Sequence, residues 1–311
     1  MKSILLGSRL LRLVSTATLS GLAFFCAGVA PATAAVKVLH FTATAGELSN
    51  GVFYLTDPSL DGKPNAKLTI TQRYTSVFNN HPVGVFFDIG KLPKGKWAIA
   101  NEDLVALPVG VEFNVLVGTH ATAIATPINT VGAATYIKTG MKKPPFTPAP
   151  PAGTKPGFLF FTHNQVPYPG LDGGIYSVHH QCLGYDGSVS LPLISNKWFI
   201  HNIDGKNAEV ASYFIFDATT PPKGATVFGH TSTAGNIPPA AMQTTTLSNP
   251  ATDGHPNALV FIAPLADFTN DKEVGVYYDP AQQKWSIFNE DNSNFTAGLY
   301  YNVLVFPAVT P

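Results

Sequence analysis

The sequence predicts an all-β protein made of three tandem repeats, each a β-sandwich or barrel-like unit, that are tightly joined behind an N-terminal signal peptide. The pattern Lys-Trp-x-Ile-x-Asn-x-Asp occurs three times, starting at Lys96, Lys197 and Lys284. The 27 Gly and 26 Pro residues favour short elements joined by turns. No stretch after the signal peptide carries a sustained helical period with capping residues. Repetition and turn-rich composition together therefore indicate strands.

Residues 1–35 are predicted to be a signal peptide. Lys2, Arg9 and Arg12 give a positive start, an apolar stretch runs from Leu19 to Val29, and Ala32-Thr33-Ala34 fits the small-residue cleavage rule. The apolar stretch is too short for a membrane span. We therefore expect a secreted or periplasmic protein without a membrane-spanning segment. Only Cys182 would remain in the mature chain, which excludes an internal disulfide.

The repeats are predicted to cover residues 36–117, 118–217 and 218–311. In each, an apolar opening strand with a Thr-rich turn is followed by two further strands, the Trp strand and a closing strand, which is Phe113–Val117 in the first repeat and Tyr301–Val305 in the third. The middle repeat is degenerate, and its register places His179 on His81 of the first repeat. It also places the proline-rich segment 142–156 in a loop of the middle repeat, as an insertion rather than a linker. Near Gly118, the closing strand of the first repeat runs directly into the opening strand of the second, without linker residues between them. This tight connection predicts repeats that pack against each other.

The motifs also carry a resemblance. The strings Asn80-His81-Pro82-Val83-Gly84-Val85-Phe86-Phe87-Asp88 and Lys96-Trp97-Ala98-Ile99-Ala100-Asn101-Glu102-Asp103, followed by Phe113-Asn114-Val115, are similar to a tandem domain of exported bacterial proteins. No function is assigned to that domain. The resemblance implies three copies in the mature chain and brings no catalytic or binding residues.

Composition restricts the function classes. Lys+Arg and Asp+Glu balance at 19 each, which gives no electrostatic footprint for nucleic acid. Charged residues make up 12% of the chain, against roughly 25% in an average soluble domain. There is no Gly-x-Ser-x-Gly, no His-Glu-x-x-His and no Gly-rich phosphate loop. Cys182 lacks a recognisable catalytic setting. An enzyme is therefore less expected than a binding protein, and no catalytic or cofactor-binding residue is predicted.

Every Trp strand ends in an Asn-x-Asp pair. Carboxylate and amide oxygens could together hold Ca²⁺. Alternatively, the same side chains close a turn by bonding their own backbone, and each Trp anchors a core. We favour the structural interpretation, because a turn that is built three times needs no ligand. The motif residues are Trp97, Asn101, Asp103, Trp198, Asn202, Asp204, Trp285, Asn289 and Asp291.

A second candidate site lies in the middle repeat, where histidines gather around the single cysteine. These side chains could bind Cu or Zn if their strands converge. The alternative is that a degenerate repeat has drifted and carries ordinary imidazoles and a small buried thiol. The candidate ligands are His163, His179, His180, Cys182 and His201.

The adjacent aromatic pairs Phe86-Phe87 and Tyr277-Tyr278 should each turn one ring outward, where it could stack on a sugar or on a partner protein. A second sheet that covers this face is an equal alternative. The sequence thus favours an exported, non-enzymatic β-repeat protein that binds a surface, a glycan or a protein. A metal-binding exported protein or enzyme, and a structural envelope or matrix component, are the alternatives.

Overall fold

The computed structural model describes residues 36–91, 93–118, 122–124, 130–131, 134–137, 157–164, 178–186, 197–206, 212–265 and 270–308. These residues form strands and turns without a helix, which confirms the all-β prediction for the described part of the chain. The signal peptide and the proline-rich insertion lie outside it. None of the described residues belongs to a helix that is long and apolar enough to cross a membrane. Residues 34–311 form one compact unit.

The described strands are numbered along the chain. We call the predicted repeats the first, middle and third segments. The first segment holds β1 (Lys37–Thr42), β2 (Leu48–Ser49), β3 (Val52–Tyr54), β4 (Lys67–Arg73), β5 (Val83–Asp88), β6 (Lys96–Asn101) and β7 (Glu112–Gly118). The middle segment holds β8 (Thr122–Ile124), β9 (Thr130–Val131), β10 (Ala134–Tyr136), β11 (Leu159–Asn164), β12 (Gln181–Asp186), β13 (Lys197–Asn202) and β14 (Ser212–Asp217). The third holds β15 (Thr226–Thr231), β16 (Thr244–Thr246), β17 (Leu259–Leu265), β18 (Val274–Asp279), β19 (Lys284–Asn289) and β20 (Tyr300–Phe306).

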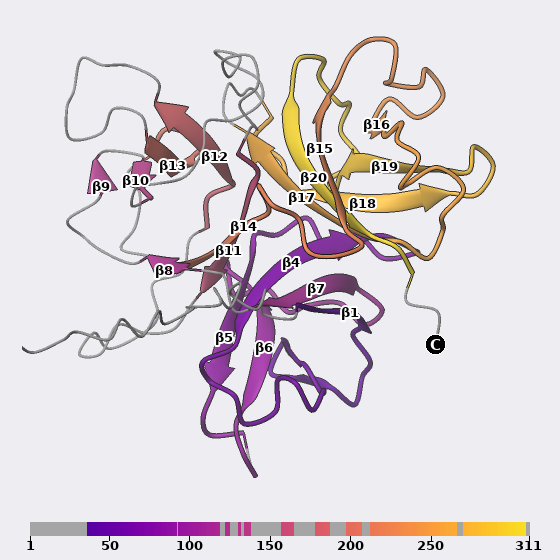
Figure 1. Ribbon diagram of the computed structural model, residues 1–311. Helices are drawn as coiled ribbons and strands as arrows, with labels where there is room; N and C mark the ends of the chain where they lie inside the picture. The colour runs from indigo at the N-terminus through magenta and orange to yellow at the C-terminus, as the bar shows by residue number, and fades with distance from the viewer. Residues whose placement is uncertain are drawn as a thin grey trace, which may run out of the picture. The chain divides into compact units, whose positions relative to one another are not determined.

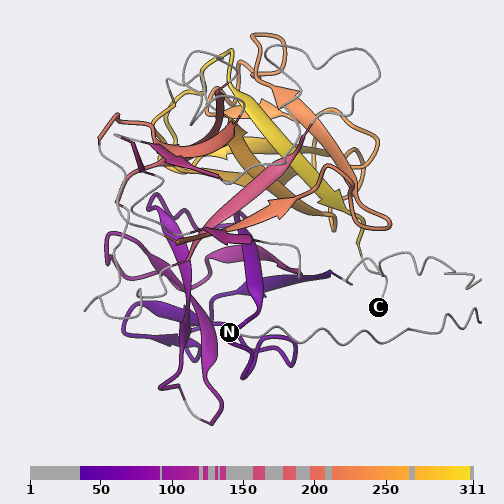
Figure 2. The ribbon, with the colours of Figure 1, turned by 60° about the vertical axis from the view of Figure 1, so that its left-hand side comes forward.

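Each segment divides its strands between two sheets (Figures 1 and 2). Sheet A has the order β1-β7-β4-β18-β19-β16 and joins the first segment to the third. Sheet B, β2-β3-β6-β5-β11-β14-β8, joins the first to the middle, and sheet C, β15-β20-β17-β12-β13-β10-β9, joins the third to the middle. Strands pair antiparallel within a segment, whereas the joins β4–β18, β11–β5 and β12–β17 are parallel. The three segments are therefore linked in a ring by shared sheets.

Three apolar clusters form the core, and each contains one tryptophan. Trp97, Trp198 and Trp285 are at most 2% exposed. The indole nitrogen of Trp97 donates to the carbonyl of Lys63, and that of Trp285 donates to the carbonyl of His255, both at 2.9 Å. The partner strand supplies an aromatic ring edge-on to each indole at 5.6–5.7 Å: Phe87, Tyr185 and Tyr278. The Trp strand is thus the packing centre of each segment.

The outward rings of the predicted aromatic pairs are not fully exposed. Phe86 and Tyr277 are half-buried, and the ring of Tyr277 lies edge-on to Phe288 at 5.9 Å. Tyr74 and Phe78, from the loop after β4, lie against the same Phe288. A loop of the first segment therefore covers this face of the third, in place of the second sheet that the sequence allowed.

The strands β4, β11 and β17 lie at the junctions between segments, where strands of two segments pair in parallel. We call these junctions seams. Thr162 on β11 accepts a hydrogen bond from the backbone nitrogen of Ile70 on β4 at 2.9 Å. Thr71 on β4 accepts one from Ile262 on β17 at 3.2 Å. At the corresponding position of β17 stands Ala263, which has no hydroxyl. These seam contacts hold the three strands beside one another at the place where the candidate site lies.

A candidate ligand pocket where the three segments meet

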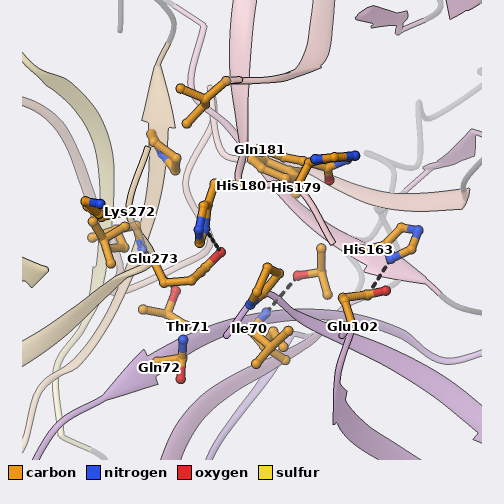
Figure 3. Close-up of a pocket in the computed structure, with 18 of the residues that line it drawn as sticks. Ile70, Thr71, Gln72, Glu102, His163, His179, His180, Gln181, Lys272 and Glu273 are labelled. Atoms are coloured by element: carbon orange, nitrogen blue, oxygen red, sulfur yellow. Dashed lines mark hydrogen bonds and ion pairs between the residues drawn. The ribbon is translucent and has the colours of Figure 1, made fainter. Parts of the chain in front are cut away.

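A pocket of about 120 Å³ lies at the carboxyl ends of β4, β11 and β17. All three segments contribute to it, which Figure 3 shows in close-up. The strand ends supply Gln72 and His163, and the loops before β12 and β18 supply His180 and Glu273. Glu102, which directly follows β6, completes the wall nearest His163. We call this feature the central pocket.

The residues that line the central pocket differ between the segments, although the surrounding scaffold is repeated. Three sets of aligned positions reach the pocket or its immediate surroundings, and in none of them is the residue type the same in all three segments. They are Gln72, His163 and Pro264; Pro82, His180 and Glu273; and Glu102, Ile203 and Glu290. The Trp, Asn and Asp of the motif, by contrast, are the same in all three segments. The repeated scaffold thus encloses an asymmetric pocket.

A buried histidine–carboxylate contact closes one side of the central pocket. His163 Nδ1 lies 2.5 Å from Glu102 Oε1, and the two side chains are 4% and 1% exposed. His163 lies on β11 and Glu102 follows β6, so the contact crosses the seam between the middle and first segments. The contact gives the buried carboxylate and the Nδ1 atom of the buried imidazole a hydrogen-bond partner, which lowers the cost of burying them.

A second contact crosses the seam between the middle and third segments. His180 Nδ1 lies 2.7 Å from Glu273 Oε1 (Figure 3). Burial lowers the pKa of His180, but the hydrogen bond and the negative charge of Glu273 outweigh burial, and the net effect is a raised pKa. The imidazolium form of His180 is therefore favoured in the folded protein.

A third type of pair recurs in every segment, and two of its basic side chains, His179 and Lys272, line the pocket. Nδ1 of His81 lies 2.6 Å from Asp103 Oδ2, and Nδ1 of His179 lies 2.8 Å from Asp204 Oδ2. In the third segment, Lys272 stands at the position of these histidines, 3.5 Å from Asp291 Oδ2. A basic side chain thus pairs with the motif aspartate three times.

The other oxygen of each motif aspartate closes a turn. Asp103, Asp204 and Asp291 accept hydrogen bonds through Oδ1 from the backbone nitrogens two residues ahead, at 3.2, 3.0 and 2.8 Å. This is the structural role that the sequence favoured for the Asn-x-Asp pairs. The motif asparagines are buried, and Asn101 exchanges two side-chain hydrogen bonds with Asn79 at 2.9 and 3.0 Å.

Two buried side chains at the pocket keep a nitrogen without a hydrogen-bond partner in the described structure: Gln72 Nε2 and His163 Nε2. Gln72 is 3% exposed, and its Oε1 accepts a hydrogen bond from Asn79 Nδ2 at 2.9 Å. Figure 3 draws the amide nitrogen of Gln72 on the side of Thr71. An unsatisfied buried amide costs about 1–3 kcal/mol, so a ligand group that accepts its hydrogen bond would recover that free energy.

Glu290 lies at the remaining seam, between the third and first segments. Its Oε2 accepts a hydrogen bond from the backbone nitrogen of Asn79 at 3.0 Å, and the side chain is buried. Burial raises the pKa of Glu290 to about 8; the charge of Glu273 adds to the rise and the Asn79 N–H opposes it. Two seams therefore hold a buried carboxylate, Glu102 or Glu290, and the third holds the partly buried contact between Glu273 and His180.

Of the five candidate metal ligands, the structure brings three to the central pocket: His163, His179 and His180. Each of the three pairs with its own carboxylate, in a different direction. Cys182 and His201 contact each other instead, with 3.5 Å between Sγ and Nε2. Burial raises the pKa of the Cys182 thiol, which disfavours the thiolate that a metal or a nucleophilic reaction needs.

Within the described residues, no group of three or more His, Cys, Asp or Glu side chains is placed to hold a metal ion. The Cu or Zn site in the middle segment and the Ca²⁺ site at the Asn-x-Asp pairs therefore stay predictions that no observed arrangement supports.

Sequence reasoning from the middle repeat alone missed the pocket partners in the other segments: Gln72, Glu102, Lys272 and Glu273. A signal was present in the alignment, because the positions around the shared Trp motif differ in residue type between repeats. Which of these variable positions meet across a seam depends on how strands are shared between segments.

Comparison with protein families assigns the chain to one family. Residues 15–117 and 188–305, which together make up more than half of the chain, match the family model described as "Domain of unknown function (DUF7452)". The chain therefore belongs to this family, and it is an all-β protein with an uncharacterised domain. Searches of curated proteins and of solved structures gave no match.

Proposed function

We propose that this protein is exported and acts by binding rather than by catalysis, with its ligand in the central pocket between three tandem repeats. The observation that carries the proposal is the buried amide nitrogen of Gln72, which lines the pocket and has no partner in the described structure. Native proteins rarely leave such a group unsatisfied without a reason, and an absent ligand is one.

The pattern of variation also supports binding. Scaffold residues are the same in the three segments, whereas the pocket positions combine amide, imidazole, carboxylate and apolar groups. A pocket with a few polar groups among apolar ones at the junction of structural units is the usual form of a ligand site. Export is supported by the predicted signal peptide, and an exported binder would meet glycans or surface proteins.

The hydroxyl groups of the pocket and the nearby thiol of Cys182 are placed in ways that do not favour catalysis. The hydroxyls of Thr71 and Thr162 accept backbone hydrogen bonds across the seams. The thiol of Cys182 is fully buried. A nucleophile activated by an adjacent base would need a side chain that is released from such contacts.

Ligand screening of the mature chain tests the proposal. We expect compounds from one chemical class to raise the melting temperature and to shift the NMR signals of pocket residues. Gln72→Met should weaken that response, whereas Gln282→Met on the exposed β18–β19 turn should not. Turnover of a substrate that depends on His163 would contradict the proposal, and so would a response that is confined to Cu²⁺, Zn²⁺ or Ca²⁺.

Export is tested separately by cell fractionation and N-terminal sequencing of the mature protein. Cleavage next to Ala34 and recovery outside the cytoplasm are the expected results. An uncleaved protein in the cytoplasm would contradict this part of the proposal.

A further inference from the structure

Resting on the proposed binding role of the central pocket, we infer that its ligand is a neutral, hydroxyl-rich ring of the size of one sugar unit, such as a residue of a glycan. The inference depends on how charge, hydrogen-bonding capacity and space are distributed among the pocket residues.

Each acidic side chain around the pocket already contacts a basic side chain. Glu102 pairs with His163, Glu273 with His180, Asp204 with His179, and Asp291 with Lys272. An anionic or cationic ligand would have to leave water without gaining an uncommitted charge in return. A neutral ligand avoids that cost, so a pocket whose acidic and basic side chains are already paired disfavours ionic ligands.

The hydrogen-bonding groups around the pocket include both donors and acceptors. Gln72 offers an N–H without a partner in the described structure, and the carboxylate of Glu273 has lone pairs beyond the one that it gives to His180. Tyr301 adds a phenol that is hydrogen-bonded to Asn270, and burial raises the pKa of this phenol, which keeps it protonated. A hydroxyl group both donates and accepts hydrogen bonds, so several hydroxyls on one ring can bond to both the donors and the acceptors of the pocket.

Much of the remaining wall is apolar, with Pro82, Val83, Ile203, Val274 and Pro264 among its residues. Aliphatic side chains of this kind pack against the C–H face of a saturated ring. The volume of about 120 Å³ is smaller than that of a cavity of about 150 Å³ that accommodates benzene. The pocket therefore has room for at most one six-membered ring, and any further sugar units would lie outside it.

The test titrates the mature chain, by calorimetry and by NMR, with neutral monosaccharides and short neutral oligosaccharides. Matched uronic acids and amino sugars provide the charged counterparts, and short peptides provide a different class. We expect a neutral sugar to bind, with NMR shifts centred on Gln72, His180 and Val83. Its uronic acid and amino counterparts should bind at least about tenfold more weakly.

Gln72→Met removes the amide, and we expect about tenfold weaker sugar binding, the change that corresponds to about 1.4 kcal/mol. Because this variant also loses the hydrogen bond from Asn79, Gln72→Glu is the second variant: it keeps an acceptor for Asn79 and removes the donor. Both should lose affinity, while Gln282→Met keeps it.

The outcomes separate the two proposals. Pocket binding of a charged compound or a peptide in preference to neutral sugars would overturn the inference and leave the binding role standing. No pocket binding by any class would overturn both. Sugar binding that the Gln72 variants do not weaken would place the ligand elsewhere and would also overturn the inference.

Discussion

His163 Nδ1 and Glu102 Oε1 lie 2.5 Å apart in the protein interior, although 61 residues separate them in the sequence and they belong to different predicted repeats. At the aligned positions of the next seam stand Pro264 and Ile203, which are apolar. The same location in the scaffold thus holds either a polar pair or an apolar pair. Replacing only one residue of the polar pair should destabilise the fold, because the other polar side chain would stay buried without its partner.

The first prediction follows from this pair. Glu102→Ala should lower the free energy of unfolding by about 3–5 kcal/mol, because it leaves the buried imidazole of His163 without its partner. Glu102→Ile combined with His163→Leu should recover much of the loss, since an apolar pair occupies the aligned positions elsewhere. Urea unfolding followed by tryptophan fluorescence measures both. A double variant less stable than either single variant would contradict the compensation.

A second prediction concerns pH and Glu290, whose pKa of about 8 in the folded state lies above the ordinary value of 4.5. The folded protein then holds a proton that the unfolded chain releases. The stability that this proton contributes is fully present below pH about 4.5 and is lost as the pH rises toward about 8. Glu290→Gln should therefore flatten the decline in the free energy of unfolding between pH 5 and pH 8.

Unfolding curves at four pH values, for the wild type and for Glu290→Gln, provide the comparison. Glu47→Gln at a surface turn removes one carboxylate in the same way and is the control. Identical pH slopes for the wild type and Glu290→Gln would show that this carboxylate does not titrate as described.

The third prediction concerns two asparagines that fasten one segment to the next. Asn114 Nδ2 donates to the carbonyl of Val260, and Asn302 Nδ2 donates to the carbonyl of Leu159, both at 2.9 Å. At the corresponding register position of β14 stands Phe214, whose ring instead packs against Trp97 at 5.7 Å. Asn114→Ala and Asn302→Ala should each cost about 1–3 kcal/mol, because each leaves a buried carbonyl with a lost hydrogen bond.

The control for the asparagine variants is Asn65→Ala, which changes an exposed side chain and should alter stability by less than about 0.5 kcal/mol. Thermal and urea unfolding of the three variants give the comparison. Equal stability of Asn114→Ala and Asn65→Ala would mean that the contact to Val260 contributes nothing.

The fourth prediction tests the packing of the middle segment. A Cβ atom at Gly184 would lie 2.2 Å from the ring of Phe199 on the neighbouring strand, whereas a Cβ atom at Gly46 would meet nothing within 4 Å. Gly184→Ala should lower the melting temperature, with a cost of about 1–3 kcal/mol from overpacking. Gly46→Ala should leave it nearly unchanged. A tolerated Gly184→Ala would show that Phe199 moves aside freely.

Much of the fold could be predicted from local patterns. Alternation along Lys96–Asn101 indicated a strand, and the repeated tryptophans indicated buried anchors, because both depend on neighbouring residues alone. The turn role of Asp103 and its counterparts was also accessible, since an aspartate that bonds the backbone two residues ahead needs no distant partner.

The pairing of strands from different segments in one sheet could not be predicted in the same way. β4 could pair with β5 of its own segment or with β18 of the third, because similar repeats present similar strand edges to one another. The central pocket depends on that choice, since Gln72, His163 and Glu273 come from three segments. Reading the histidines of the middle repeat as one cluster therefore grouped side chains that turn toward different carboxylates.

The ring of shared sheets has a consequence for how such a chain can change in length. Removing residues 118–217 would take away β11 and β12, the partners of β5 and β17. Two strand edges would then stand open, and exposed edges invite pairing between molecules. Loss of one segment by recombination would thus be penalised through aggregation.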